Sequence, residues 1–437
     1  MATVQPEELL HYVWKNRLFG DTLPTTEGGV VQVIDVGTHN HDSGPDFFNA
    51  KVMIDEILWV GDVEIHTIAS DWERHRHGDD PHYNSVILHA VETADRTSTL
   101  RPDGSTIPIA LLRVPPSVKQ NMDYLLDKNR SYGCLPDLYL VPQIEMTSWM
   151  IHLLSERMAS KAHRITSLLA LHENDWEEVL HITLCRAFGF GLNNDAFELL
   201  ARSLPFKVLR KHNDVLSDIE ALLFGQAGLL SAPTPRDDYE AHLQMRYRHL
   251  STKYGLQPQR MSNLRWARTR PYSFPEVRLA QLAKLIHRSA GLFSKIIATK
   301  GLEELRSMMQ TSVSFYWRTA FRIGERAPSF TPKRLSSMMV DILLINTIIP
   351  IRFAYFDYRH DEEKLSDTLS ILEEIPAEHN TITKHFVVNG VRSESAFDSQ
   401  ALIQLKREYC DKRRCIQCRI GLMLLRLKAK KGDGVVE

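Results

Sequence analysis

Two apolar, strand-like runs stand only two residues apart near the start of this 437-residue chain. The first covers residues 47–54 and the second residues 57–65, with residues 55–56 between them. A two-residue connection is typical of a tight β-hairpin turn, so the two runs are expected to pair antiparallel. This pairing brings the start of the first run beside the end of the second. Asp46 and Glu64 are therefore expected to meet at one edge of a sheet.

A histidine adds an imidazole to these two carboxylates. Glu64 and His66 stand two positions apart, and alternate residues of a strand point to the same face of a sheet. Two carboxylates and an imidazole are suitable ligands for a divalent cation that activates water against a phosphodiester. Carboxylates favour Mg²⁺ or Mn²⁺, whereas an imidazole shifts the preference toward Mn²⁺, Fe²⁺ or Zn²⁺. We predict Asp46 and Glu64 as cation ligands, with His66 positioning or deprotonating the attacking water.

The segments around this hairpin indicate an α+β domain. Apolar residues with helical spacing run from Pro6 to about residues 19–20. Strand-like runs follow at residues 30–36, 47–54, 57–65, 85–91 and 107–114, and Ser70 or Asp71 begins a short helix after the third of them. The expected order is therefore helix, three strands, helix, strand, strand.

The sequence changes character after Pro116. From about residue 118 to residue 409, apolar residues recur with the helical period of about 3.6 residues. A proline-rich turn at residues 231–235 divides this large, mainly helical region. We predict four parts: a nuclease-like α/β domain at 1–117, helical regions at 118–232 and 233–400, and a basic, cysteine-containing segment at 401–437.

The N-terminal order and its acidic residues resemble the PD-(D/E)xK superfamily of restriction-endonuclease-like nucleases. The resemblance covers roughly residues 5 to 115, where an acidic residue opens the second strand and Glu-x-His closes the third. It implies an αβββαβ core in which Asp46 and Glu64 hold one or two Mg²⁺ ions. His66 occupies the position at which that superfamily has a lysine, so the metal and the activity both depend on what histidine does there.

Histidine is concentrated in the same part of the chain. Seven of the 19 histidines lie between residues 39 and 89. His39 and His41 directly precede Asp46, and we predict them as further metal ligands. His75, His77 and His82 follow the third strand, where they either bind a metal or phosphate or are ordinary polar residues of a loop; the second interpretation is favoured.

Three cysteines near the C-terminus have the spacing of a second metal site. Cys410, Cys415 and Cys418 form a Cys-x4-Cys-x2-Cys pattern that can hold zinc or an iron–sulfur cluster. The fourth ligand would be Cys134, His385 or another distant group. The alternative is a helix with buried thiols. Because five cysteines are few and odd in number for a large chain, reduced thiols and a cytoplasmic location are expected.

Any nucleic-acid partner must be held by local patches, because the formal net charge is only −1. Arg265, Arg268 and Arg270 stand in a basic stretch interleaved with aromatic residues, and Arg413 and Arg414 stand in the basic tail. Basic side chains neutralise phosphates and aromatic rings stack on unpaired bases. We predict these arginines as nucleic-acid contacts; solvated helix faces are the alternative.

The whole chain is also similar to an uncharacterised bacterial conserved-domain family. The shared signatures are Gly-Pro-Asp-Phe at 44–47, Gly-Asp-Val-Glu-Ile-His at 61–66 and Asp-Trp-x2-His-x-His at 71–77. This similarity supplies a grouping and no mechanism.

The leading hypothesis is a metal-dependent phosphodiester hydrolase that acts on DNA or RNA, with Mg²⁺ or Mn²⁺ bound and Zn²⁺ as an alternative. A second hypothesis is a non-catalytic nucleic-acid-binding or scaffold protein with a degenerate nuclease fold. A third is a phosphoesterase of small molecules that uses a histidine-rich metal site. No membrane association is expected, because there is no uninterrupted run of about 18 apolar residues. The sequence carries no signal for the oligomeric state.

Overall fold

Two compact units make up the chain in this computed structural model. The first unit contains residues 1–153, 381–392 and 402–437, and the second contains residues 154–380 and 393–401. The structure describes residues 6–20, 22–40, 42–126, 132–258, 264–267, 269–326 and 330–432. Segments from both ends of the chain build the first unit, so these units divide the chain differently from the predicted boundaries after residues 117, 232 and 400.

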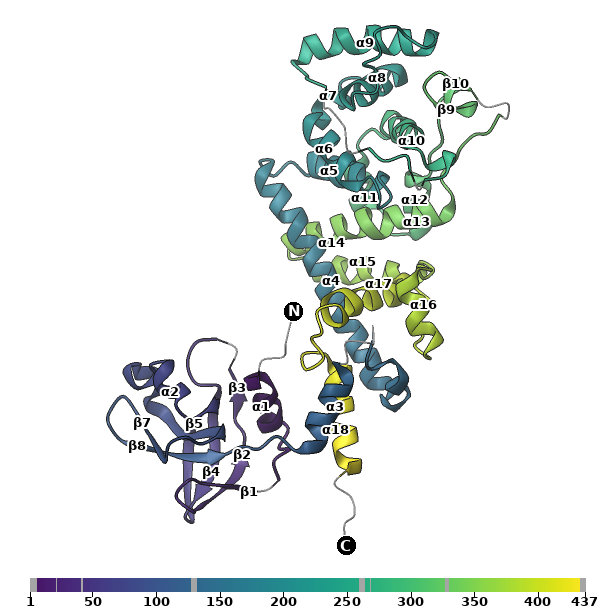
Figure 1. Ribbon diagram of the computed structural model, residues 1–437. Coiled ribbons are helices and arrows are strands. Elements are labelled where there is room, and N and C mark those ends of the chain that lie inside the picture. The colour runs from purple at the N-terminus through teal and green to yellow at the C-terminus, as the bar shows by residue number, and fades with distance from the viewer. Residues whose placement is uncertain are drawn as a thin grey trace. The chain divides into compact units, whose positions relative to one another are not determined.

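A mixed β-sheet lies in the N-terminal part of the first unit (Figure 1). Its strands are β1 (Thr22–Pro24), β2 (Val30–Asp35), β3 (Thr38–His39), β4 (Phe47–Ile54), β5 (Ile57–Ile68), β6 (Val86–Thr93), β7 (Ser98–Leu100) and β8 (Thr106–Leu111). They pair in the order β1-β2-β4-β5-β6-β8-β7, and β3 pairs with β4. Neighbours among β2, β4 and β5 are antiparallel, whereas β5, β6 and β8 are parallel. The five predicted strands are present, and β1, β3 and β7 are additional.

The hairpin between β4 and β5 has the tight turn that its length requires. Asp55 and Glu56 both adopt left-handed φ angles, of 50° and 62°, as a type I′ turn requires. Residues 62–66 of β5 are all buried, because α1 (Pro6–Lys15) and α2 (Asp71–Arg74) both pack against this strand. The buried end of β5 is therefore the end that carries Glu64 and His66.

A β-bulge in β4 determines which residue stands opposite Glu64. The pairing of β4 with β5 is regular from the turn as far as Ala50, which pairs with Gly61. Between Ala50 and Phe47 the register shifts by one residue, so that Phe47 pairs with Val63. One extra residue in β4 accounts for the shift. Asp46 thereby comes opposite Glu64, where an uninterrupted ladder would have placed Phe47.

Asn49 and Asp62 hold this bulge in place. Asn49 has a left-handed φ of 54°, a conformation that asparagine tolerates better than most residues. Its backbone N–H donates to Asp62 Oδ1 at 3.0 Å, and the hydroxyl of Ser85 donates to Asp62 Oδ2 at 2.6 Å. The buried Asp62 carboxylate therefore fixes the bulge to the residue that directly precedes β6.

Helix α1 covers the sheet through an apolar face. Leu10, Val13 and Trp14 are fully buried, and the Trp14 indole N–H donates to the carbonyl of Val36 at 3.0 Å. The helix ends at Lys15, about one turn earlier than the sequence predicts. The hydroxyl of Tyr12 donates to the carbonyl of Leu422 at 2.7 Å, which ties this helix to the C-terminal segment.

Helices form most of the remaining chain, as predicted. In the first unit, or shared with the second, they are α3 (Pro116–Leu125), α4 (Gln143–Leu171), α16 (Thr381–Val388), α17 (Ala396–Gln404) and α18 (Arg419–Gly432). The second unit contains α5 (Trp176–Phe188), α6 (Asn194–Ser203), α7 (Phe206–Arg210), α8 (Leu216–Gln226), α9 (Asp238–Tyr254), α10 (Pro275–Arg288), α11 (Leu292–Ala298), α12 (Leu302–Met309), α13 (Ser337–Leu343), α14 (Ile349–Tyr358) and α15 (Glu362–Glu374), with a hairpin of β9 (Ala320–Arg322) and β10 (Glu325–Arg326).

One helical segment of the second unit is apolar enough to be compared with a membrane span. Ser337–Tyr358 is long and apolar enough to cross a membrane, judged by length and composition alone. However, 72% of its most apolar 18-residue stretch is buried inside the structure. Arg352 within it is also buried, and its guanidinium donates to the carbonyls of Ile296 and Thr299, both at 2.5 Å. Such burial is expected of a helix in a protein core.

Candidate metal centre

Asp46 and Glu64 are each hydrogen-bonded to the backbone of the other strand. Glu64 Oε2 accepts from the backbone N–H of Asp46 at 3.1 Å, and Asp46 Oδ2 accepts from the backbone N–H of Ile65 at 2.8 Å. The Glu64 side chain is 6% exposed and that of Asp46 is 21% exposed. The two carboxylates therefore meet at one end of the hairpin, as the sequence predicts, and Glu64 Oε1 remains for other partners.

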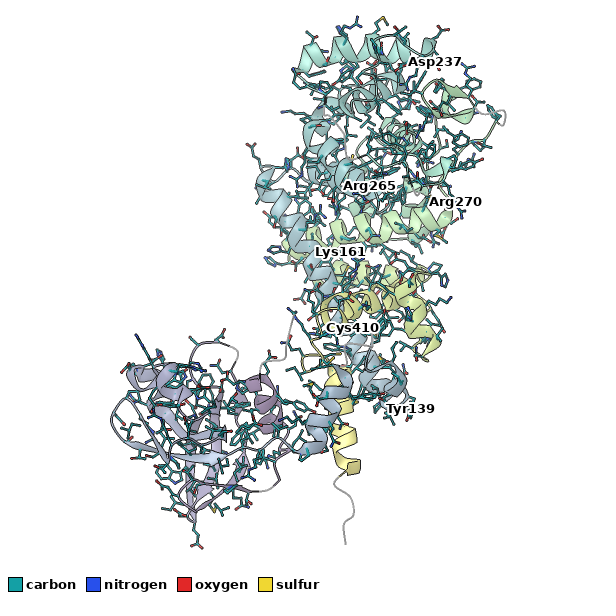
Figure 2. The ribbon with its side chains drawn as sticks, in the orientation of Figure 1. Tyr139, Lys161, Asp237, Arg265, Arg270 and Cys410 are labelled. Carbon is teal, nitrogen blue, oxygen red and sulfur yellow. The ribbon has the colours of Figure 1, made fainter. Side chains whose placement is uncertain are left out.

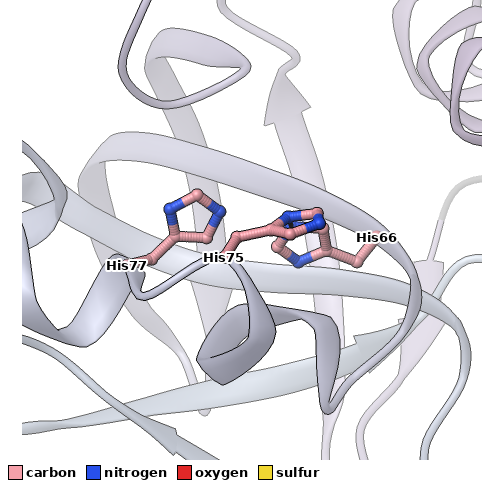
Figure 3. A group of neighbouring side chains, drawn as sticks. All are labelled: His66, His75 and His77. Carbon is pink, nitrogen blue, oxygen red and sulfur yellow. Dashed lines mark hydrogen bonds between the residues drawn. The ribbon is translucent and has the colours of Figure 1, made fainter.

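Two histidines approach Glu64 Oε1, and a third lies beside one of them. His66 Nε2 lies 3.5 Å and His77 Nε2 lies 3.2 Å from this oxygen. His75 Nδ1 lies 3.2 Å from His66 Nε2. The ligand atoms of the three histidines all lie within 4.8 Å of one another (Figure 3). The three imidazoles thus face one small volume, Glu64 Oε1 lies beside His66 and His77, and His66 shares its face of β5 with Glu64 as predicted.

A tight reversal after α2 brings His75 and His77 to this place. Arg76 between them has a left-handed φ of 63°, which is uncommon for a residue with a side chain. The rings of His75 and His77 lie 5.0 Å and 5.3 Å from the ring of His66, centroid to centroid. The backbone at Arg76 therefore directs both imidazoles toward β5.

The spacing of these atoms fits a bound cation. Bonds of about 2.0–2.1 Å place the ligands of a tetrahedral ion about 3.4 Å apart. The distances from Glu64 to His66 and His77, and from His66 to His75, are 3.2–3.5 Å. Within the described part of the chain, the buried Nε2 of His77 has no partner with hydrogen-bond geometry. A shared cation accounts for its close approach to Glu64 better than a hydrogen bond does.

A series of hydrogen bonds that begins at Nδ1 of His66 orients its ring. His66 Nδ1 lies 2.9 Å from His89 Nε2, and His89 Nδ1 lies 2.9 Å from Thr99 Oγ1. If Nε2 of His66 is a ligand, its Nδ1–H donates to His89, and the Nδ1–H of His89 donates to Thr99. Metal-bound histidines usually donate their second N–H in this way, which fixes the tautomer and the ring.

An apolar cluster supports the opposite side of the site. The Tyr83 ring stacks on His77 with centroids 4.0 Å apart, and Trp72 contacts the rings of His77 and His89 at 5.4 and 5.3 Å. Trp72 and Tyr83 are buried together with Val86 and Ile107. This packing restricts the rotamers of the two histidines, so the donor atoms are held in position before any ligand binds.

A polar cavity of about 470 Å³ opens onto these groups. Its lining includes Glu7, Asp42, Gly44, Asp46, Glu64, His66, His75, Arg76, His77, Asp80 and Tyr83. Both carboxylates and all three imidazoles therefore face a space that a solute can enter.

Burial governs the protonation of the site. It lowers the pKa of His66 to about 2, with neighbouring imidazoles adding to the effect, and lowers the pKa of His89 to about 3. It also lowers the pKa of His77. Burial and the charge of Asp46 raise the pKa of Glu64 to about 9. The buried imidazoles of His66, His77 and His89 thus favour the neutral form, which is the form of histidine that binds metal.

His11 of α1 is a member of the site that the sequence analysis does not identify. Its Nε2 lies 3.1 Å from Asp46 Oδ2. Burial alone lowers the pKa of His11, but the hydrogen bond and charge of Asp46 outweigh burial and raise it above its ordinary value. A single histidine in a helix has no spacing signal, so only the packing of α1 on the sheet reveals its role.

A family model described as "Protein of unknown function (DUF2851)" matches residues 7–381. The chain belongs to this family. The predicted membership of an uncharacterised conserved-domain family is therefore confirmed. No curated protein and no solved structure matches the chain. The DUF2851 match includes the whole hairpin and every histidine of the site, and it ends before the three C-terminal cysteines.

Within this DUF2851 chain the predicted metal ligands are only partly brought together. His39 stacks on Phe47 with centroids 4.7 Å apart and does not belong to the group around Glu64. His41 lies outside the described residues. The residues that join Glu64 and His66 are instead His75 and His77, which the sequence analysis favoured as loop residues. His82 is exposed, with its Nδ1 2.7 Å from Asp80 Oδ1, and it is not part of the group of His66, His75 and His77.

The predicted nucleic-acid contacts of this DUF2851 chain are divided between the two units. Arg265 and Arg270 are exposed in the second unit (Figure 2), and Arg268 lies outside the described residues. Arg414 is exposed in the first unit, whereas Arg413 donates to the carbonyl of Leu126 at 2.7 Å.

Part of the basic and aromatic stretch in the second unit is used inside the protein. Arg246 forms two hydrogen bonds with Asp218, both at 2.7 Å. The Trp266 indole N–H donates to Glu276 Oε2, also at 2.7 Å. These contacts explain part of the stretch by packing, so it gives less support to a nucleic-acid surface than its composition indicates.

The pH dependence of stability should reveal the buried ionisable groups. Above about pH 4.5 the unfolded chain ionises Glu64, whereas the metal-free folded protein keeps it protonated up to about pH 9, so stability falls as pH rises. Below about pH 6.5 the unfolded chain protonates His66 and His89, which stay neutral when folded, so stability also falls as pH drops.

We therefore expect the combined contribution of these three groups to the stability of the metal-free protein to be greatest near pH 6.5, because two histidines outweigh one carboxylate below that value. Each group changes the free energy of unfolding by about 1.4 kcal/mol per pH unit. Urea unfolding of chelator-treated protein across this range measures the effect. Glu64→Gln should remove much of the fall above about pH 7, and an unchanged alkaline fall in that variant would contradict the raised pKa.

Proposed function

We propose that this protein is a metal-dependent phosphodiesterase that cleaves DNA or RNA. The observation that carries the proposal is the cluster of His66, His75 and His77, two of which, His66 and His77, also lie beside one oxygen of Glu64. The carboxylate of Asp46 lies on the neighbouring strand and faces the same cavity.

The ligand set favours Zn²⁺ or Mn²⁺ over Mg²⁺. Three imidazoles and one carboxylate suit these ions, whereas Mg²⁺ prefers oxygen ligands and several waters. A bound ion of this kind supplies Lewis acidity and a hydroxide nucleophile near neutral pH. Compared with the Mg²⁺ or Mn²⁺ expected from the sequence, the added nitrogen donors of His75 and His77 move the preference toward zinc and manganese.

The residues beside the ligands have roles in this scheme. His11 holds a proton at Nε2 next to Asp46, so the pair can orient water or deliver a proton to a leaving oxygen. The guanidinium of Arg76, whose residue lines the cavity, can neutralise a phosphate oxygen. The buried His66–His89–Thr99 chain keeps the ligand His66 neutral and correctly rotated.

The topology supports nucleic acid as the substrate. Helix α1, the antiparallel strands β2, β4 and β5, helix α2 and the parallel strand β6 follow one another in the order that the PD-(D/E)xK resemblance implies. Asp46 and Glu64 stand at the positions of the two acidic residues in that resemblance, and His66 stands at the position of its lysine.

A small phosphorylated molecule is the second candidate substrate. The cavity volume of about 470 Å³ lies within the usual range for small-molecule sites. Glu7, Asp42 and Asp80 also line the cavity, and their charges oppose the approach of a polyanion. This observation favours a compact substrate whose own phosphate is bound directly at the centre.

Incubation of the pure protein with single-stranded, duplex and structured nucleic acids, in Zn²⁺, Mn²⁺ or Mg²⁺, tests the proposal. We expect cleavage with Mn²⁺ or Zn²⁺ and none after treatment with a chelator. Hydrolysis of small phosphoesters alone would select the second candidate. Binding of nucleic acid without cleavage in every metal would contradict both and support the scaffold hypothesis.

A further inference from the structure

Four of the five cysteines belong to the first unit, at two places far apart in the sequence. Cys134 directly precedes a 3₁₀ helix at Leu135–Leu140, and Cys410 (labelled in Figure 2) ends a π-helical turn at Leu405–Cys410. Cys415 and Cys418 stand just before α18. All four are free thiols. His385 is the other candidate for a fourth ligand. Its ring packs on the ring of Tyr132, with 5.3 Å between the two ring centroids.

The two segments that carry these cysteines lie side by side. Lys406 Nζ is 4.8 Å from the centre of the Tyr132 ring. Arg413 Nη1 donates to the carbonyl of Leu126 at 2.7 Å, across 287 positions in the sequence. The Cys415 sulfur lies 4.0 Å from the carbonyl oxygen of Leu125. Residues 125–126 and Tyr132 therefore lie beside the segment that contains the other three cysteines.

The four thiols are also within electrostatic range of one another. Cys134 interacts with Cys415 and Cys418, and Cys410 interacts with all three others. Burial is the main cause that raises the pKa of each thiol, to about 12 for Cys134 and about 11 for Cys418. A metal would have to displace these protons, as it does in other cysteine sites.

Backbone N–H groups lie near the Cys418 sulfur. Those of Ile420 and Gly421 act to lower the pKa of this thiol, against the larger effect of burial. The N–H of Cys418 donates to the carbonyl of Cys415 at 3.3 Å, so the two cysteines close a tight turn. A side chain at Gly421 would place its Cβ 2.1 Å from the Cys415 carbonyl oxygen, so this approach requires glycine. N–H groups directed at sulfur are typical of thiolates that bind metal.

We propose that Cys134, Cys410, Cys415 and Cys418 are the four thiolate ligands of one iron–sulfur cluster. Among the described residues, no three of these sulfur atoms all lie within 4.8 Å of one another. A single zinc ion with bonds of about 2.3 Å needs its sulfurs about 3.8 Å apart. The larger iron–sulfur cluster accepts a wider separation. Bound there, the cluster would fasten the C-terminal segment to the chain at Cys134, independently of the histidine centre.

Iron, zinc and acid-labile sulfide should be measured in the full chain purified without oxygen. We expect about four iron and four sulfide per chain, and loss of more than half of both in Cys134→Ala and in Cys415→Ala. Cys185→Ala is the matched control, because Cys185 is the fifth cysteine, is fully buried and lies in the second unit. It should keep the full content.

X-ray absorption at the iron edge of the unmutated protein keeps the test valid if a variant fails to fold. A first shell of sulfur neighbours together with a second shell of iron neighbours would support the cluster, whereas sulfur neighbours alone would indicate a single iron ion and overturn it. Zinc without sulfide, the absence of stoichiometric metal, or full iron content in a folded Cys134→Ala variant would each overturn the proposal. Far-ultraviolet circular dichroism establishes which variants are folded.

Discussion

Glu64→Gln should abolish metal binding at the histidine centre and lower phosphoester cleavage at least about 100-fold. Glu64 Oε1 is the atom that both His66 and His77 approach, so the substitution replaces the charged ligand that the site shares. Loss of groups that only support a ligand costs about 10- to 100-fold in affinity or activity, and a direct ligand should cost at least as much. Titration calorimetry and initial rates measure the two effects.

The same substitution should not destabilise the metal-free protein. Burial and Asp46 disfavour the charge of Glu64, and glutamine is neutral and of the same shape. Glu73→Gln is the matched control, because Glu73 is exposed and pairs with Arg96 at 3.0 Å. It should keep both metal affinity and rate. Metal binding that survives Glu64→Gln, or that is lost in Glu73→Gln, would contradict the assignment.

Asp62→Ala should have the second-largest effect, although Asp62 is not a ligand. Its carboxylate accepts from the backbone N–H of Asn49 and from the hydroxyl of Ser85. Alanine leaves both donors without this acceptor, which should cost about 2–3 kcal/mol in the free energy of unfolding. Without this support the bulge can relax toward a regular ladder that places Phe47 opposite Glu64.

We therefore expect Asp62→Ala to lower the urea midpoint and to weaken metal binding at least about tenfold, because Asp46 and Glu64 lose their alignment. Asp62→Asn is the comparison: its carbonyl oxygen can still accept one hydrogen bond, so its metal affinity should stay close to that of the unmutated protein. If Asp62→Ala binds metal as tightly as the unmutated protein, the bulge does not position the site.

The hairpin, and the position of Glu64 and His66 on one face of a strand, could be predicted because both depend only on the number of residues between two positions. Two residues between strands specify a tight turn, and a separation of two positions specifies one face. The exact register could not be predicted in this way. Asn49 looks like any polar residue in a strand, and a bulge depends on an acceptor, Asp62, that only the folded hairpin supplies.

The remaining ligands depend on backbone conformation and packing. His75 and His77 converge because Arg76 is left-handed, and arginine has no preference for that conformation. His11 reaches Asp46 because α1 packs on β5, and Cys134 reaches the C-terminal cysteines through a tertiary contact. None of these contacts can be predicted from the identity of the side chains alone. The sequence therefore predicted where the site lies but did not predict all the residues that form it.

X-ray absorption of the zinc-loaded protein would test the central claim, that Glu64, His66, His75 and His77 hold one cation. The iron–sulfur assignment concerns other residues, so a variant without Cys134 can be used if the cysteines also take up zinc. We expect about three imidazole rings and one carboxylate oxygen around each zinc ion at about 2.0–2.1 Å. In His77→Gln the spectrum should show one imidazole ring fewer around zinc than in the unmutated protein. In His82→Gln the number of rings should be unchanged. A shell of oxygen atoms without imidazole, or an identical spectrum in His77→Gln, would contradict it.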